Sequence, residues 1–342
     1  MTLLPVKTEV LRVDAADPQP EAIERAAAVI REGGLVAFPT ETVYGLGADA
    51  TRPDAVAAIY AAKGRPPTNP IIVHVASVEE AQQVAAQWPQ VASRLAQRFW
   101  PGPLTLVVWR SPRVPAIVAG GGDTVAVRAP AHPVAQALIQ ASGVPIAAPS
   151  ANRSSRVSPT RAEHVLKHLE GRIHLVLDGG PTPGGIESTV LDVTCVPPRL
   201  LRPGPIPPRD LQKIAGTVEL HAPLRTAGPM PSPGMLPRHY APSVPLELAA
   251  GSGRQRVEDL VSRGIRTGWL PFHPSNPVPG AVTIPMPRNP GDYASLLYAT
   301  LHTLEDAGVQ IIVAAMPPNR EEWLGVRDRL LRAAAPQEEG GP

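Results

Sequence analysis

The sequence predicts a mixed α/β fold in two domains, and three observations carry this prediction. Helical patterns alternate with short apolar runs rich in β-branched residues, as expected of a sheet flanked by helices. The 342 residues are long for one hydrophobic core and comfortable for two. A proline-rich stretch interrupts the alternation, which then resumes. We therefore expect a first domain over residues 1–221, a semi-extended linker over 222–245, a smaller α/β domain over 246–335 and a tail over 336–342.

Helices are predicted from apolar periodicity and from the residues that start and stop them. Pro20 suits a first helical position, and Ser77 and Thr160 each open a capping box. The predicted helices of the first domain span 20–32, 53–63, 77–87, 91–100, 133–141 and 160–170. Those of the second domain span 255–263, 292–306 and a last stretch that ends near 334.

Strands are predicted where short runs of branched apolar residues are bounded by turn residues. In the first domain these runs span 35–39, 71–75, 104–109, 124–129, 144–148, 173–177, and a closing hairpin of 189–195 with 199–202. In the second domain they span 265–270, 281–286 and 310–316. The polar segment 39–47 is expected to be a loop that the first strand delivers.

Composition bounds the class of protein. The chain is 43% hydrophobic with a formal net charge of +2, so it should fold, and it lacks the overall basic footprint that dominates nucleic-acid binding. Its one cysteine, Cys195, excludes an intramolecular disulfide and a zinc site built from several thiolates. No apolar run approaches the roughly 18 residues of a membrane span, and the first residues lack the apolar core of a signal peptide. We expect a cytoplasmic protein without a membrane segment.

Chemistry-bearing residues gather between Pro39 and His74, at the ends of apolar segments where loops often carry function. Neither a P-loop nor a Gly-x-Gly-x-x-Gly turn after a strand occurs in the chain. A bound nucleotide would therefore need convergent cations and hydroxyls. Candidates for that role are Lys63, Arg65, Ser150, Asn152 and Ser158. Each has a structural alternative, since a lysine can complement a helix C-terminus and a serine can cap a helix.

Other residues are open to two interpretations. Arg128 directly follows an apolar strand, so it either grips a carboxylate or ends the strand at the surface. His74 lies inside an apolar run, where a core histidine is the commoner outcome. Small residues at 147–152 and 185–190 would let a ligand approach the backbone, or they make ordinary turns. Arg202 is a strand end or a phosphate contact.

Taken together, the motifs resemble one family. The pair Lys63-x-Arg65, the later Ser150-x-Asn152 and the segment 39–47 are closely similar to the YrdC/Sua5 family of threonylcarbamoyl-AMP synthases. Residues 232–242 and the second domain resemble the longer, two-domain Sua5 form. The resemblance implies a YrdC-like catalytic domain with a twisted mixed sheet and flanking helices, followed by a smaller Rossmann-like α/β domain.

The resemblance also implies an activity. L-threonine, bicarbonate and ATP, with Mg²⁺ accompanying the nucleotide, would give threonylcarbamoyl-AMP and pyrophosphate for the t6A modification of tRNA by a downstream transferase machinery. By motif position it implies L-threonine contacts at Thr42, His74, Arg128, Ala148 and Ser188. It implies ATP contacts at Lys63, Arg65, Asn69, Thr124, Ser150, Asn152, Ser158, Arg202 and Tyr240. No protein side chain is assigned to a metal.

Two rival functions stay in view. A non-enzymatic RNA-binding or ribosome-maturation factor is disfavoured as the main role by the near-neutral charge, while weak RNA binding remains among the expected interactions. Carbamoyl transfer of the hydrogenase-maturation kind is disfavoured because proteins of that kind carry zinc-finger cysteines, which the lone Cys195 cannot provide.

Overall fold

The computed structural model describes residues 6–220, 230, 232, 234 and 238–336. The chain divides into two compact units. The first comprises residues 1–154, 159–183 and 187–235, and the second comprises 155–158, 184–186 and 236–342. Much of the expected linker, at 222–229, 231, 233 and 235–237, lies outside the described residues, as does the expected tail at 337–342.

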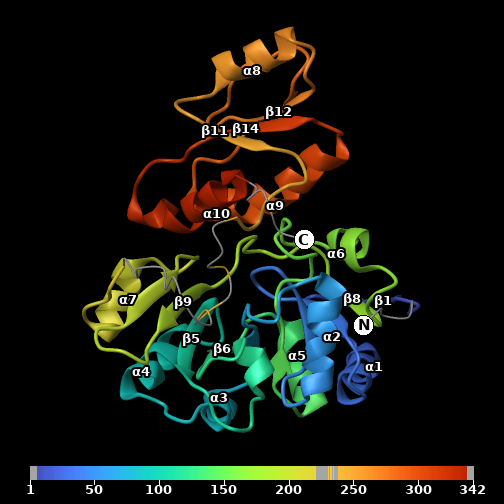
Figure 1. Cartoon of the computed structure of the whole chain (residues 1–342), viewed down its shortest axis with the longest axis vertical. Helices are drawn as coiled ribbons and strands as arrows, with labels where there is room; N and C mark the ends of the chain where they lie inside the picture. Colours follow the sequence, from blue (N-terminus) through green and yellow to red (C-terminus); the bar gives the residue numbers. More distant parts are fainter. Residues whose placement is uncertain (1–5, 221–229, 231, 233, 235–237, 337–342) are drawn as a thin grey trace. The chain divides into compact units, whose positions relative to one another are not determined.

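The first unit is built on a ten-stranded mixed sheet with strand order β1-β8-β2-β3-β7-β4-β6-β5-β9-β10. Figure 1 labels β1, β5, β6, β8 and β9 of this sheet. Its strands are β1 (Glu9–Arg12), β2 (Val36–Pro39), β3 (Tyr44–Asp49), β4 (Ile72–His74), β5 (Leu104–Trp109), β6 (Thr124–Arg128), β7 (Ile146–Ala147), β8 (Leu175–Asp178), β9 (Thr189–Asp192) and β10 (Arg199–Arg202). Strands β4 and β6 pair in parallel, whereas β2 and β3 pair antiparallel. The predicted mixed sheet is confirmed, and so is the antiparallel pairing of the last two strands.

Helices cover this sheet. They are α1 (Pro20–Arg31), α2 (Pro53–Lys63), α3 (Val78–Val84), α4 (Gln90–Phe99), α5 (Pro133–Ser142), α6 (Ala162–Leu169), α7 (Pro208–Ala215) and the 3₁₀ helix η1 (Ala116–Ala119). Ser77 accepts a hydrogen bond from the backbone N–H of Glu80 at 3.3 Å, so it caps α3 as predicted. The box expected at Thr160 does not form, because α6 starts one residue later, after Arg161. Helices α7 and η1 were not predicted.

The segment 39–47 is not a loop throughout, which corrects the sequence-based expectation. Residues from Tyr44 onward form β3, antiparallel to β2. The two glycines in this stretch favour a loop when they are read alone. In the fold they let the strand sit close to its neighbours, since a Cβ on Gly47 would lie 2.8 Å from side-chain atoms of Phe38 and of Ile146.

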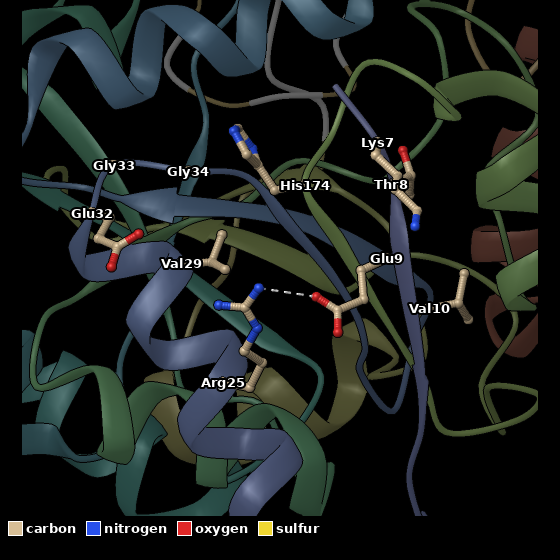
Figure 2. Close-up of a pocket in the computed structure, with 10 residues that line it drawn as sticks. All are labelled: Lys7, Thr8, Glu9, Val10, Arg25, Val29, Glu32, Gly33, Gly34 and His174. Carbon is tan, nitrogen blue, oxygen red and sulfur yellow. Dashed lines mark hydrogen bonds and ion pairs between the residues drawn. The ribbon is translucent and has the colours of Figure 1, made fainter. Parts of the chain in front are cut away.

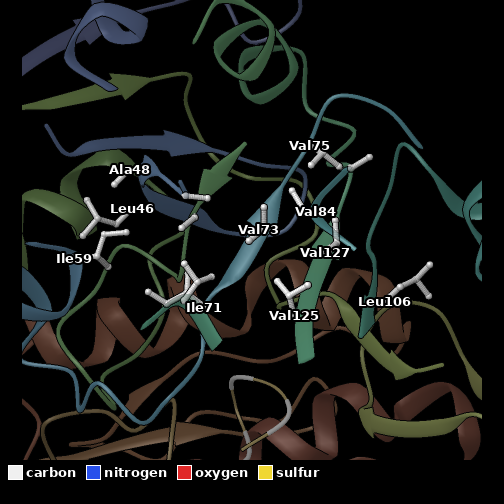
Figure 3. Packing of buried hydrophobic residues seen from close by; sticks show 14 of the residues in the cluster. Leu46, Ala48, Ile59, Ile71, Val73, Val75, Val84, Leu106, Val125 and Val127 are labelled. Atoms are coloured by element: carbon white, nitrogen blue, oxygen red, sulfur yellow. The ribbon is translucent and has the colours of Figure 1, made fainter. Parts of the chain in front are cut away.

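Alternation along the strands divides the core between the two faces of the sheet. On β2, Val36 and Phe38 pack with α1 and α5, whereas Ala37 belongs to a second cluster that includes residues of α2. Helices α1 and α5 lie side by side (Figure 1). Figure 3 shows part of the second cluster, where Val125 and Val127 of β6 point to the same side as Val73 of β4. The side chains that alternate with these valines along β4 and β6 must therefore point to the opposite face of the sheet.

The second unit contains a four-stranded parallel sheet with strand order β11-β14-β12-β13. The strands are β11 (Leu246–Ala249), β12 (Thr267–Leu270), β13 (Val282–Thr283) and β14 (Ile311–Ala315). The helices are α8 (Arg254–Ser262), α9 (Pro290–Asp306), η2 (Glu321–Trp323) and α10 (Leu324–Ala334). A separate parallel α/β unit of the predicted Rossmann-like kind is therefore present. Within the part of the chain that the structure describes, no helix is both long enough and apolar enough to cross a membrane.

Candidate functional site

Several polar side chains share one face of the central strands. His74 on β4 and Arg128 on β6 are partners in the parallel ladder, so their side chains point to the same side. Thr105 of β5 pairs with Val190 of β9, and Ser188 has the same parity as Val190. Next to these polar groups lies a small apolar cluster from the same strands: Ile72, Val107, Ala126, Val190 and the partly buried Leu201. The strand period of two thus collects the polar groups over an apolar floor.

Arg128 is the centre of this group. It is 3% exposed, which excludes the surface alternative. Its Nε donates to the carbonyl of Gly102 at 3.2 Å, and its Nη1 donates to the hydroxyl of Thr42 at 3.0 Å. Its Nη2 lies 2.7 Å from Oε1 of Glu41. The turn between β2 and β3 therefore brings two polar side chains to the guanidinium.

His74 lies beside this arginine in a buried position. Its ring meets that of Phe38 edge to face, with centroids 6.3 Å apart. Burial lowers the pKa of His74 to about 3, and the positive charge of Arg128 acts in the same direction. The imidazole is therefore neutral at physiological pH. Its Nδ1 atom makes no aligned hydrogen bond to the described residues.

Ser188 connects this group to Arg202. The serine hydroxyl lies 2.7 Å from the hydroxyl of Thr105 and accepts a hydrogen bond from Nη2 of Arg202 at 3.1 Å. The Nε of Arg202 donates to the backbone carbonyl of Ser188 at 3.0 Å. Ala148 completes the predicted threonine set, and its backbone N–H donates to the carbonyl of Ile72 at 2.9 Å.

Lys63 links the two halves of the family signature. It is the last residue of α2 and is 2% exposed. Its Nζ donates to the backbone carbonyl of Ser150 at 2.5 Å and also to that of Asn152. Burial first, and then the nearby charge of Arg65, holds the pKa of Lys63 well below its usual range. The Lys-x-Arg and Ser-x-Asn motifs are thus in direct contact.

Arg65 and Asn69 form a neighbouring pair. Nη2 of Arg65 donates to Oδ1 of Asn69 at 2.6 Å and to the carbonyl of Pro70 at 2.8 Å. The Nδ2 of Asn69 is buried without a hydrogen-bond partner in the described part of the chain. Thr124 begins β6 and Arg128 ends it. Four residue steps along the strand place the two about 13 Å apart.

Ser158 and Tyr240 belong to the second unit. The carbonyl of Ser158 lies 3.3 Å from Nε2 of His302 on α9. Tyr240 is 1% exposed and adopts a left-handed backbone conformation with φ of 59°. The guanidinium of Arg329 lies 5.0 Å from its ring centroid. Both predicted ATP contacts are therefore held by residues of their own unit.

The described residues include no cluster of three or more His, Cys, Asp or Glu side chains that could hold a metal ion. Figure 2 shows a cavity of about 750 Å³ beside β1 and α1, where Arg25 and Glu9 form an ion pair at 3.2 Å. None of the predicted site residues lines this cavity.

Sequence reasoning missed two contributors to the site. Glu41 was part of the polar segment but received no role, and its pairing with Arg128 depends on the fold. Thr105 interrupts an otherwise apolar strand, and this lone hydroxyl was a signal that could have been used.

The chain matches known families over most of its length. Residues 28–204 match the Sua5_yciO_yrdC family model, described as "Telomere recombination". Residues 206–335 match the model of the "Threonylcarbamoyl-AMP synthase, C-terminal domain".

Similar proteins and solved structures agree with these matches. A threonylcarbamoyl-AMP synthase of Pyrococcus abyssi is 43% identical over 91% of this chain and 94% of its own length. One of Bacillus subtilis is 43% identical over 93% of both chains. The crystal structure of P. abyssi Sua5 complexed with L-threonine superimposes with a TM-score of 0.87 and 41% identity, covering 96% of this chain and 97% of that one. The chain belongs to the Sua5/YrdC family of threonylcarbamoyl-AMP synthases, in its two-domain form.

Proposed function

We propose that this protein is an L-threonylcarbamoyladenylate synthase. It converts L-threonine, bicarbonate and ATP into threonylcarbamoyl-AMP, pyrophosphate and water, and it is therefore a nucleotidyltransferase. The observation that carries the proposal is the direct contact of Lys63 with the Ser150–Asn152 segment, in a unit that also holds a polar group centred on Arg128. The names of relatives that span the whole chain point to the same reaction.

L-threonine is assigned to the group around Arg128. A guanidinium can bind the substrate carboxylate through two parallel hydrogen bonds. Thr42 orients that guanidinium from one side, and the neutral ring of His74 lies on the same face of the sheet. Ser188 supplies a hydroxyl, and Ala148, which directly follows β7, supplies a small side chain. Binding in this way would fix the amine for reaction, and orientation of this kind lowers the barrier.

ATP is assigned to the group around Lys63 and Arg65. Both cations are buried, and an approaching polyphosphate would favour the charged form of Lys63. Further ATP contacts are proposed at Asn69, Thr124, Ser150, Asn152, Ser158, Arg202 and Tyr240. Mg²⁺ is proposed to arrive with the nucleotide as part of the substrate, because it is usually bound through substrate phosphates.

The reaction depends more on stabilising negative charge than on proton transfer by a side chain. Threonine binds as its zwitterion and first loses the ammonium proton to solvent. The neutral amine then attacks the carbon of bicarbonate to give a carbamate, and water leaves. A carbamate oxygen then attacks the α-phosphorus of ATP, and pyrophosphate leaves. Lys63 and Arg65 would stabilise the charge that develops on the phosphate oxygens. We assign no side chain as a general base.

The product suggests the setting of the enzyme. Threonylcarbamoyl-AMP is a reactive mixed anhydride, so it should be consumed promptly by a transferase that modifies tRNA to t6A. We place the protein in the cytoplasm on this basis, with that transferase machinery as its downstream partner and with RNA binding at most weak.

One assay tests the proposal. Purified protein is incubated with ATP, Mg²⁺ and bicarbonate, and pyrophosphate is measured with and without L-threonine. We expect release that depends on threonine and is lost in Arg65→Ala, whereas Glu9→Gln, at an exposed ion pair, keeps it. Release that is independent of threonine, or absent, would refute the proposed function.

A further inference from the structure

Both carboxylate oxygens of Glu41 are buried, and the reaction described above assigns this residue no role. It lies on the turn between β2 and β3, next to Thr42, and its side chain is 16% exposed. Its Oε1 lies 2.7 Å from Nη2 of Arg128, whose side chain is 4% exposed. Its negative charge also reaches His132, where it opposes the lowering of the pKa that burial causes.

This ion pair leaves hydrogen-bonding capacity unused on both partners. Within the described part of the chain, neither carboxylate oxygen of Glu41 has an aligned hydrogen bond, and the same holds for Nη2 of Arg128. The two charges therefore neutralise each other, but the N–H groups on Nη2 and the carboxylate oxygens make no well-aligned hydrogen bonds. Buried charged groups are costly unless their hydrogen bonds are also made, so this arrangement is suited to receiving a ligand.

The ligand that fits such a pair carries both charges close together. In an α-amino acid the ammonium and the carboxylate are attached to the same carbon, so the two groups that receive them have to lie side by side. Glu41 and Arg128 meet this requirement. Thr42, the neighbour of Glu41, already bonds the same guanidinium, so a single turn positions both halves of the receptor.

We propose that Glu41 binds the ammonium group of the substrate amino acid while Arg128 binds its carboxylate. The inference rests on the proposed function, because it assumes that threonine occupies this group of residues. It makes Glu41 a specificity-determining residue, which selects zwitterionic amino acids against hydroxy acids of the same shape. A purely structural Glu41 would neutralise Arg128 and would be indifferent to the amine of the ligand.

Equilibrium binding of two ligands distinguishes these roles. L-threonine and (R)-3-hydroxybutanoate share the carboxylate, the hydroxyl and the methyl group, but only threonine has the amine. Isothermal titration of the full-length protein is expected to show a preference for threonine of about ten- to a hundredfold, the range of hydrogen bonds between charged groups. In Glu41→Gln this preference should fall below about threefold, and Glu41→Asp, which restores the charge, should recover part of it.

A control variant and three contrary outcomes distinguish the role of Glu41 from the proposed function. Glu9→Gln removes an exposed, ion-paired carboxylate of the same unit and should keep the wild-type preference. An unchanged preference in Glu41→Gln would overturn the role of Glu41 and leave the proposed function standing. Equal binding of both ligands by the wild-type protein would overturn it without any variant, even if Glu41→Gln failed to fold. If the wild-type protein bound neither ligand and released no pyrophosphate with threonine, the proposed function itself would fall.

Discussion

The pair of Arg128 and Glu41 should show its energetic coupling when one partner is removed. Arg128→Met deletes the guanidinium and leaves the Glu41 carboxylate, only 16% exposed, without its counter-charge. Breaking a buried ion pair in this way costs about 3–5 kcal/mol of unfolding free energy, whereas replacing both partners is far less destabilising. The double variant Arg128→Met with Glu41→Gln should therefore be more stable than Arg128→Met alone, by about 2 kcal/mol or more.

Calorimetric unfolding of the full chain measures this coupling. For a unit of roughly 150–250 residues each kcal/mol corresponds to about 2–4 °C, so Arg128→Met should lower the first unit's melting temperature by roughly 6–20 °C. Adding Glu41→Gln should return several degrees of that loss. If the losses of the two single variants simply add in the double variant, the buried pair is not coupled and the reasoning fails.

Three further predictions concern packing, protonation and the nucleotide. Gly47→Ala should cost about 1–3 kcal/mol in a thermal melt, since its Cβ would lie 2.8 Å from Ile146; an unchanged melting temperature would contradict this packing. The folded pKa of His74 is about 3, against 6.5 for an ordinary histidine, so its contribution to stability is full above about pH 6.5 and is lost as the pH falls toward 3. Between pH 7 and pH 4.5 the wild-type protein should lose about 2–3 kcal/mol of unfolding free energy through this group, and His74→Gln should not show that loss. Denaturant titrations at the two pH values measure the difference. In titration calorimetry, Lys63→Met should weaken ATP binding at least about tenfold and leave threonine binding within about twofold. The control Lys213→Met, at an exposed lysine, should change neither affinity. Normal ATP affinity in Lys63→Met would show that this lysine is not part of the nucleotide site.

Local signals were enough to predict most of the fold. Proline at the start of α1 and of α2, and Gly64 after α2 with φ of 60°, mark boundaries that depend only on neighbouring residues. The β3 strand escaped prediction because its glycines are explained by the side chains of Phe38 and Ile146, which pack there only in the folded sheet. The capping box at Thr160 failed because the helix begins at Ala162.

The resemblance predicts which residues form the site, and the structure adds how those residues are connected. Resemblance supplied the residues, and the strand ends supplied a reason for Arg128 to be special. The pairing of Lys63 with backbone carbonyls rather than with a side chain could not be foreseen, since carbonyl positions leave no trace in the sequence. The same is true of Glu41, because its partner Arg128 lies far along the chain and comes beside it only in the folded sheet.

The strand alternation beneath the site also ties its survival to that of the fold. Val73 and Val127 face the core, and their chain neighbours His74 and Arg128 face the site. A slip of one residue in the pairing of these strands would exchange the two sets, sending an arginine and a histidine into the apolar interior and valines into the site. A chain with this mispairing would not fold stably. Selection for a stable core therefore also preserves the placement of the polar groups.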